Sequence, residues 1–247
     1  MQTKLNYIFI IGLVLLTGGC IQKPGSEYKP SYLDSTREMT RRGEYQKALD
    51  RYLWFHNHIL EQDTGMSGVR LSFALSYWKE LAKVYPPAMT ALKGDRDKKT
   101  EQIISNGNPG DFFADVAAIN RTLNENNKTI ELFELISNKY PVFAREIIRY
   151  VLHDLLISKR YDLIKRNVVD MMEQYNRIES NYRRSFKEIG NSDKSLKSYS
   201  EDSFVHEVLE LIQYCNSTGD KITAAKIRMK ALALVKDSRI KKAFLDK

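Results

Sequence analysis

Cysteine is scarce in this sequence of 247 residues, which has only two, Cys20 and Cys215. Two cysteines allow at most one disulfide, so no disulfide framework holds the fold together. Long hydrophobic runs are scarce as well, because the apolar stretch at 7–16 is shorter than the roughly 20 residues of a permanent transmembrane helix. No period-two alternation indicates a strand. A hydrophobic content of 43% nevertheless excludes a disordered chain.

Motifs for catalysis, cofactors and metals are also missing. The chain contains no Gly-x-Ser-x-Gly, no phosphate-binding loop and no HExxH. His56 and His58 point to different faces of one helix, whereas His153 and His206 each stand alone in an apolar helix. The Asp-Arg-Asp triplet at 95–97 lacks the glycine and the later acids of a calcium loop. The sequence predicts no catalytic residue, no metal site and no cofactor, and therefore a protein that is not an enzyme.

The first twenty residues are organised like an export signal. Lys4 lies in a short polar start, and the apolar run at 7–16 can enter a bilayer as a helix. Gly18 and Gly19 then allow a peptidase to approach the backbone before Cys20. The pattern predicts a signal peptide over residues 1–19.

The end of this signal, Leu-Thr-Gly-Gly-Cys at 16–20, resembles the lipobox of bacterial lipoproteins. The resemblance implies cleavage between Gly19 and Cys20, a diacylglyceryl thioether and usually an acylated amine (such as palmitate) on Cys20, and a place in the cell envelope. Thr17 stands where the lipobox prefers leucine. Ile21 is similar to the residue found there in lipoproteins sorted to the outer membrane, facing the periplasm in a diderm organism. An ordinary secretory signal that ends at a cysteine by chance is the alternative.

The charge is basic, with a formal net value of +8 that includes Lys4. A basic excess favours anionic lipid headgroups or an acidic partner, although basic and acidic residues mixed along helices also give a merely solvated surface. Nucleic acid is a poor partner outside the cytoplasm. If Cys20 carries lipid, Cys215 has no disulfide partner and is predicted to be a buried apolar side chain.

Residues 20–35 contain Pro24, Gly25 and Pro30 among polar residues, which predicts a lipidated cysteine followed by a flexible tether. From Thr36 to the end, apolar residues recur three and four apart, which predicts one all-α domain over 36–247. Two polar stretches, near 105–111 and 190–203, are predicted loops.

Four segments repeat one spacing, in which a turn is followed by a helix with small and aromatic residues on one face. The turns begin near Gly43, Asn124, Lys159 and Gly219. This spacing resembles the second helix of tetratricopeptide repeats (TPR), and Asn126 and Tyr161 are 35 positions apart, against about 34 in that family. The resemblance implies antiparallel helix hairpins stacked in a right-handed solenoid. Generic α-hairpins are the alternative.

Apolar stretches that can form partner helices of these hairpins lie at 69–84, 112–123, 143–157 and 204–215. The block at 65–87 is similar to uncharacterised bacterial repeat proteins. One predicted helix, 161–188, is too long for a single repeat, and its basic part at 175–188 is either a contact arm for lipid or protein or a solvated helix end.

The resulting expectation is a membrane-anchored envelope lipoprotein that acts as a scaffold, binding a protein or peptide on a concave surface. Candidate groove residues on first helices are Arg70, Tyr77, Trp78 and Asn120, with a core position as the alternative for Trp78. The rival is an envelope enzyme or small-ligand-binding lipoprotein whose site is assembled from His56, His153 and Asp95. A third option is a subunit of a stable envelope complex.

Overall fold

The computed structural model describes residues 31–106, 112–190 and 194–243, and these residues form helices without any strand. The all-α prediction is therefore confirmed. The signal peptide, Cys20 and most of the predicted tether lie outside the described residues. Among the described residues, no helix combines the length and the apolar character needed to cross a membrane.

The helices follow one another along the chain with short connections. The first half comprises α1 (Tyr32–Arg41), α2 (Tyr45–His58), η1 (Ile59–Glu61), η2 (Thr64–Met66), α3 (Ser67–Arg70), α4 (Phe73–Val84), α5 (Pro86–Asn106) and α6 (Phe112–Leu123). The second half comprises α7 (Asn126–Lys139), α8 (Pro141–Ile147), η3 (Ile148–Tyr150), α9 (Leu152–Ile157), α10 (Tyr161–Asn167), α11 (Met171–Ile189), α12 (Lys194–Ser217), α13 (Lys221–Leu234) and α14 (Ser238–Lys242).

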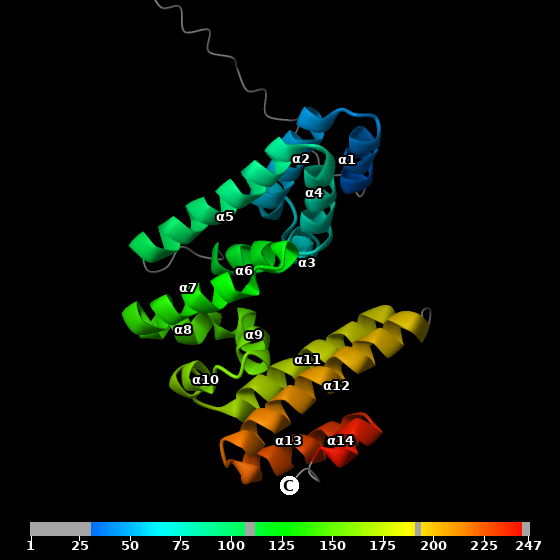
Figure 1. The fold of residues 1–247 in the computed structure, drawn as a ribbon. Coiled ribbons are helices and arrows are strands. Elements are labelled where there is room, and N and C mark those ends of the chain that lie inside the picture. The colour runs from blue at the N-terminus through cyan, green and yellow to red at the C-terminus, as the bar shows by residue number, and fades with distance from the viewer. Residues whose placement is uncertain (1–30, 107–111, 191–193, 244–247) are drawn as a thin grey trace, which may run out of the picture.

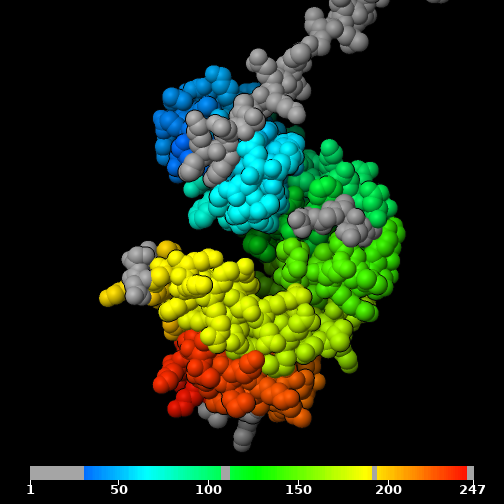
Figure 2. Space-filling view, turned by 180° about the vertical axis from the view of Figure 1, so that it is seen from behind, coloured from blue at the N-terminus to red at the C-terminus, as the bar shows by residue number. Residues whose placement is uncertain are grey.

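The chain curves from α1 at one end to α14 at the other (Figure 1). Helices α11 and α12 form a long antiparallel hairpin whose tip extends away from the body, while α13 and α14 run beneath α12. Seen from behind, the surface is hollowed between the cyan segment that contains α3 and α4 and the yellow segment that contains α11 (Figure 2). The concave side of the curve is thus open.

Two hydrophobic cores hold the curve together, and α6 contributes to both. Ala118 and Ile119 belong to the core built by α1 to α5. Phe113, Val116 and Ala117 belong to the core that continues through α7 to α14. These residues point to different sides of one helix, so α6 joins the two halves.

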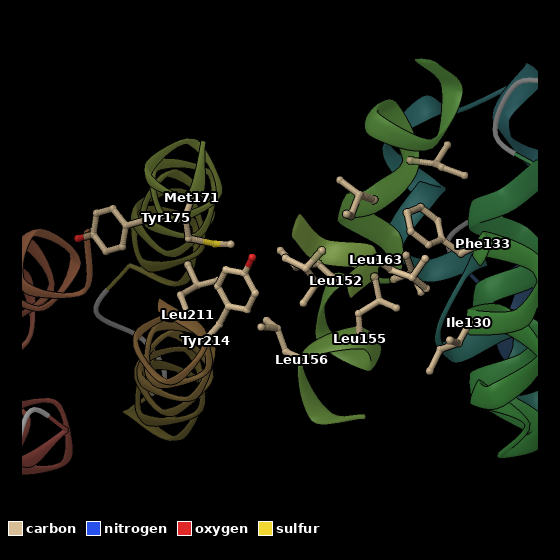
Figure 3. Close-up of a cluster of buried hydrophobic side chains, with 14 of the residues drawn as sticks. Ile130, Phe133, Leu152, Leu155, Leu156, Leu163, Met171, Tyr175, Leu211 and Tyr214 are labelled. Carbon is tan, nitrogen blue, oxygen red and sulfur yellow. The ribbon is translucent and has the colours of Figure 1, made fainter. Parts of the chain in front are cut away.

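Within the second core, α9 lies between two layers of helices (Figure 3). Leu155 packs on the side where α7 carries Phe133, whereas Leu152 and Leu156 face Leu211 of α12. All five side chains are buried. Short α9 therefore connects the α7–α8 layer to the α11–α12 hairpin.

The four turns that the sequence analysis grouped together share one backbone geometry. Their first residues all have positive φ: Gly43 +80°, Asn124 +60°, Lys159 +56° and Gly219 +85°. In each turn the next backbone N–H donates to a carbonyl five residues earlier, at 2.8 to 2.9 Å. This is the Schellman arrangement, which ends a helix by a left-handed residue. Each turn is followed at once by α2, α7, α10 or α13.

Several predicted boundaries were wrong. The chain is already helical from Tyr32, four residues before the predicted domain start at Thr36. The predicted loop at 190–203 is helical from Lys194, because residues 194–203 include no proline or glycine that would interrupt α12. At the other predicted loop, Ser105 and Asn106 belong to α5, and 107–111 lie outside the described residues.

Three long predicted helices are divided. The segment at 69–84 breaks between α3 and α4, and 143–157 comprises parts of α8, η3 and α9. The segment at 161–188 breaks at Val168, whose extended backbone (ψ 116°) ends α10. Asp170 then caps α11 by accepting a hydrogen bond from the N–H of Met172 at 2.8 Å. Apolar periodicity continues across such breaks, which is why it did not reveal them.

Candidate functional site

One hollow lies in the angle where η3 and α9 meet the α11–α12 hairpin, and its volume is about 700 Å³. Leu152 and Leu156 on α9, Ile178 on α11 and Leu211 on α12 form its apolar lining. Leu152 and Leu156 are each 8% exposed, so they form a floor rather than projecting side chains. The hollow therefore offers apolar surface within a recess.

A second hollow of about 490 Å³ continues from the first along the hairpin. The two share Ile178, Asn181 and Glu207, and the second ends near Ile189 and Leu196. We refer to the two hollows together as the α11 groove. The groove follows α11 from Glu173 to Ile189, the greater part of that helix, and is open along its length.

Ionisable side chains border the apolar floor. Nδ1 of His153 lies 2.9 Å from Oε2 of Glu210, and this hydrogen bond raises the pKa of His153. Glu207 stands one helical turn before Glu210, and its contact with Ser203 Oγ is long, at 3.4 Å. Loss of solvation, followed by the nearby charge of Glu210, raises the pKa of Glu207. Glu207 is thus a carboxylate without a strong cationic partner in the described structure.

The arrangement suits binding by shape, apolar contact and charge. Two pairs of charged groups lie along the rim, Arg177 with Glu173 at 3.0 Å and His153 with Glu210 at 2.9 Å, and the imidazole of His153 is 58% exposed. Within the described ranges, no group of three or more His, Cys, Asp or Glu side chains could hold a metal ion.

A separate polar cluster is buried in the first core. Asp115 on α6 pairs with Arg70 at 2.6 Å and with Lys99 at 2.8 Å, and Lys99 also lies 2.8 Å from Asp95. Two acids and two bases therefore neutralise one another inside the core. They connect α3, α5 and α6, and Lys99 further reaches Asn57 of α2 at 2.9 Å.

His56 adjoins this cluster and is 1% exposed. Its Nε2 atom is 3.5 Å from Asp95 and 3.7 Å from Asp115, and neither ring nitrogen has a hydrogen-bond partner among the described residues. Burial, and then the charge of Lys99, lower the pKa of His56 to about 4. At neutral pH the imidazole is therefore uncharged, and its ring packs against Trp78 with centroids 6.1 Å apart.

The structure does not bring together the three residues considered for an enzyme site, His56, His153 and Asp95. His56 and Asp95 do come together in the buried cluster, as the distance of 3.5 Å shows. His153 instead lies at the α11 groove beside Glu210. The three side chains do not form one site.

Of the four residues predicted to bind a partner, three are buried in the structure. Arg70, Trp78 and Asn120 are between 1% and 4% exposed, so they offer very little surface to a partner, although Asn120 lines a hollow of about 390 Å³. Trp78 Nε1 donates to the carbonyl of Ala88 at 3.0 Å, and Asn120 Nδ2 donates to Thr129 Oγ1 at 3.1 Å. Only Tyr77 remains partly exposed, and it lines a hollow of about 300 Å³ between α1 and α4.

Other sequence predictions have clear outcomes. Cys215 is 1% exposed, which confirms the buried side chain, and burial raises its pKa to about 12. The basic segment at 175–188 forms part of α11, where Arg177 and Arg183 pair with acids one turn earlier. Cys20 lies outside the described residues. Glu207 and Glu210 were missed, because a glutamate on an α-helix carries no local signal of a groove.

No family model matches the chain, and no similar curated protein or solved structure was found. Any assignment of function therefore rests on the geometry and the sequence of this chain alone.

Proposed function

We propose that this protein is a lipid-anchored scaffold of the bacterial cell envelope, which binds a protein or peptide in the α11 groove. The observation that carries the proposal is the groove itself, a recess with an apolar floor and a charged rim along α11. Such a long recess suits an elongated segment of a partner protein better than a compact metabolite. The protein would act by display, without chemistry of its own.

The repeat architecture belongs to this proposal. Four Schellman turns at the same place in four helix hairpins support a common ancestral unit, and the helices before and after each turn contact each other. We infer a degenerate TPR-like solenoid with right-handed stacking. Solenoids of this kind expose an elongated concave surface, and binding there is the general use of such folds.

The anchor rests on the lipobox-like sequence that ends at Cys20. Acyl chains on Cys20 would keep the groove at a membrane, where two or more chains give stable attachment. We place the protein in the cell envelope, on the periplasmic face of the outer membrane if the organism is diderm. Restriction to a membrane would raise the local concentration of partners in the same membrane.

Position-specific crosslinking in cells tests the function. A photoreactive amino acid replaces Asn181, an exposed residue of the groove, or Lys98, an exposed residue of α5 outside it. We expect a reproducible envelope-protein adduct from position 181 and not from position 98. The substitution Leu196→Asp should abolish that adduct. Equal adducts from both positions, or none from position 181, would contradict the proposal.

A further inference from the structure

The groove side of the α11–α12 hairpin exposes apolar side chains that helices normally bury. Leu196 is 51% exposed and Tyr199 74%, and both line the second hollow. On α11, Ile178, Tyr182 and Ile189 line the same hollow, and their spacing of four and seven residues places them on one face. The hairpin therefore presents an apolar stripe from both of its helices.

The other side of the hairpin is covered. Helix α13 packs against both α11 and α12, and α14 packs against α12. Figure 1 shows these two helices beneath α12, while the tip of the hairpin extends beyond α9. Two helices with one covered side and one apolar open groove have room for another helix in that groove, as in a small bundle.

The dimensions fit a helix of moderate length. The groove follows α11 from Glu173 to Ile189, which corresponds to roughly 24 Å at 1.5 Å per residue. An occupant helix of about 16 residues would cover it. The groove is open along its side, so such a helix could enter without unfolding of the scaffold.

The charge of the groove is opposite to that of the whole chain. Its described lining contains four carboxylates, two guanidinium groups and one imidazole whose pKa Glu210 raises: Glu173, Glu188, Glu207 and Glu210 against Arg149, Arg177 and His153. Arg177 is paired with Glu173, and Arg149 donates to Tyr150 Oη at 2.8 Å. Within the described part of the chain, Glu207 and Glu188 thus remain to receive cations from outside, although the whole chain has a net charge of +8.

We propose that the occupant of the α11 groove is a basic amphipathic helix of a partner protein, with an apolar stripe against the floor and lysine or arginine beside Glu207. The inference rests on the proposed scaffold function and specifies its partner. Helix-in-groove recognition of this type uses apolar residues at positions i, i+3, i+4 and i+7. Complementary charge adds selectivity, since an acidic helix of the same shape would be repelled.

A pair of designed peptides tests the charge and the shape together. Both are amphipathic 16-residue helices with one leucine stripe, and their polar positions beside the stripe are lysine in one and glutamate in the other. The full-length protein is held in phosphatidylcholine nanodiscs, and empty nanodiscs provide the background. Binding of the fluorescein-labelled peptides is followed by anisotropy.

We expect the lysine peptide to bind and the glutamate peptide to bind at least tenfold more weakly. Glu207→Gln should weaken the lysine peptide roughly five- to tenfold, and Leu196→Asp should abolish binding while the exposed position keeps the fold intact. Glu80→Gln, an exposed glutamate of α4 outside the groove, is the matched control and should change nothing. Equal binding of both peptides, no binding of either, or equal losses in the Glu207 and Glu80 variants would overturn the inference.

The crosslinking experiment separates the two proposals. If the segment captured from position 181 is acidic or not helical, the scaffold function stands and the basic-helix inference fails. An adduct between two copies of this chain would likewise overturn the inference, because the occupant would then not be a different protein. Absence of any groove-specific adduct removes both proposals.

Discussion

Nδ1 of His153 on α9 lies 2.9 Å from Oε2 of Glu210 on α12, so a contact between two residues 57 positions apart in the sequence joins these helices. Both residues line the α11 groove, where α9 meets the hairpin. The contact also sets the charge of the groove, because the carboxylate favours the protonated imidazole.

The first prediction concerns the titration of His153. The hydrogen bond to Glu210 raises the pKa of His153 above its ordinary value of 6.5. The pair therefore contributes stability that is complete below pH 6.5 and is lost as the pH rises through the raised pKa. Because the imidazole is 58% exposed, we expect a contribution below about 1 kcal/mol.

NMR titration of the imidazole checks this. Glu210→Gln should return the pKa of His153 toward 6.5. The control Glu101→Gln changes an exposed glutamate of α5 and should leave the pKa of His153 raised. An unchanged titration in the Glu210 variant would mean that the contact does not persist in solution.

The second prediction concerns the buried ion cluster. Asp115→Asn leaves the charges of Arg70 and Lys99 incompletely compensated in the core, so the free energy of unfolding should fall by about 3 kcal/mol. Asp97→Asn removes a carboxylate that is 65% exposed beside Arg96, and the loss should stay below about 1 kcal/mol. Urea unfolding measures both variants, and equal losses would show that the cluster is not buried as described.

The third prediction concerns acid stability. The pKa of His56 is lowered from 6.5 to about 4, so the unfolded chain binds a proton there more readily than the folded protein. His56 thus favours the folded state above pH 6.5, and this advantage is lost progressively as the pH falls toward 4. His56→Gln should flatten the loss of stability over that range in urea unfolding at several pH values. An identical pH profile in the variant would contradict the assigned titration.

The fourth prediction concerns the shared turns. A Cβ at Gly43 would meet no atom within 4 Å, so the effect of Gly43→Ala comes from its positive φ alone and should cost about 1 kcal/mol. Lys159→Gly, at the equivalent turn, relieves a left-handed lysine and should be neutral or stabilising. Gly94→Ala, in the middle of α5, is the contrasting control and should be stabilising. Thermal unfolding shows whether each variant is more or less stable than the wild type. Unchanged stability of the Gly43 variant would contradict the cost assigned to its positive φ.

The fifth prediction concerns the anchor. Cys20→Ala should leave an uncleaved or soluble protein that incorporates no labelled palmitate, because the acyl chains would be attached at that thiol. Cys215→Ala, which removes a buried thiol, should retain the label. Unchanged membrane retention and gel migration of the Cys20 variant would contradict lipidation.

The features that could be predicted from the sequence are those with a local signal. The all-α fold followed from apolar periodicity, and the spacing around Gly43, Asn124, Lys159 and Gly219 located four turns of identical geometry. Two of these turns lack glycine, so spacing was more informative there than composition. The helix at Phe112–Leu123 agrees with its predicted bounds at both ends.

The site was less predictable because it depends on tertiary contacts. Arg70 and Asn120 are polar and were predicted at the surface, but their partners Asp115 and Thr129 allow them to be buried. His153 was noted as an isolated residue, since nothing in the sequence indicates that α12 brings Glu210 beside it. Pairings of this kind become visible only when the helices are placed in space.

Because α6 packs in both hydrophobic cores, the two cores should unfold cooperatively. Phe113 is buried in one core and Ile119 in the other, on a helix of twelve residues. If either core unfolded, one face of α6 would lose its packing partners, and the packing of α6 against the other core would weaken. The two halves of the curve should therefore melt together in a single calorimetric transition, whereas many solenoid proteins unravel from one end.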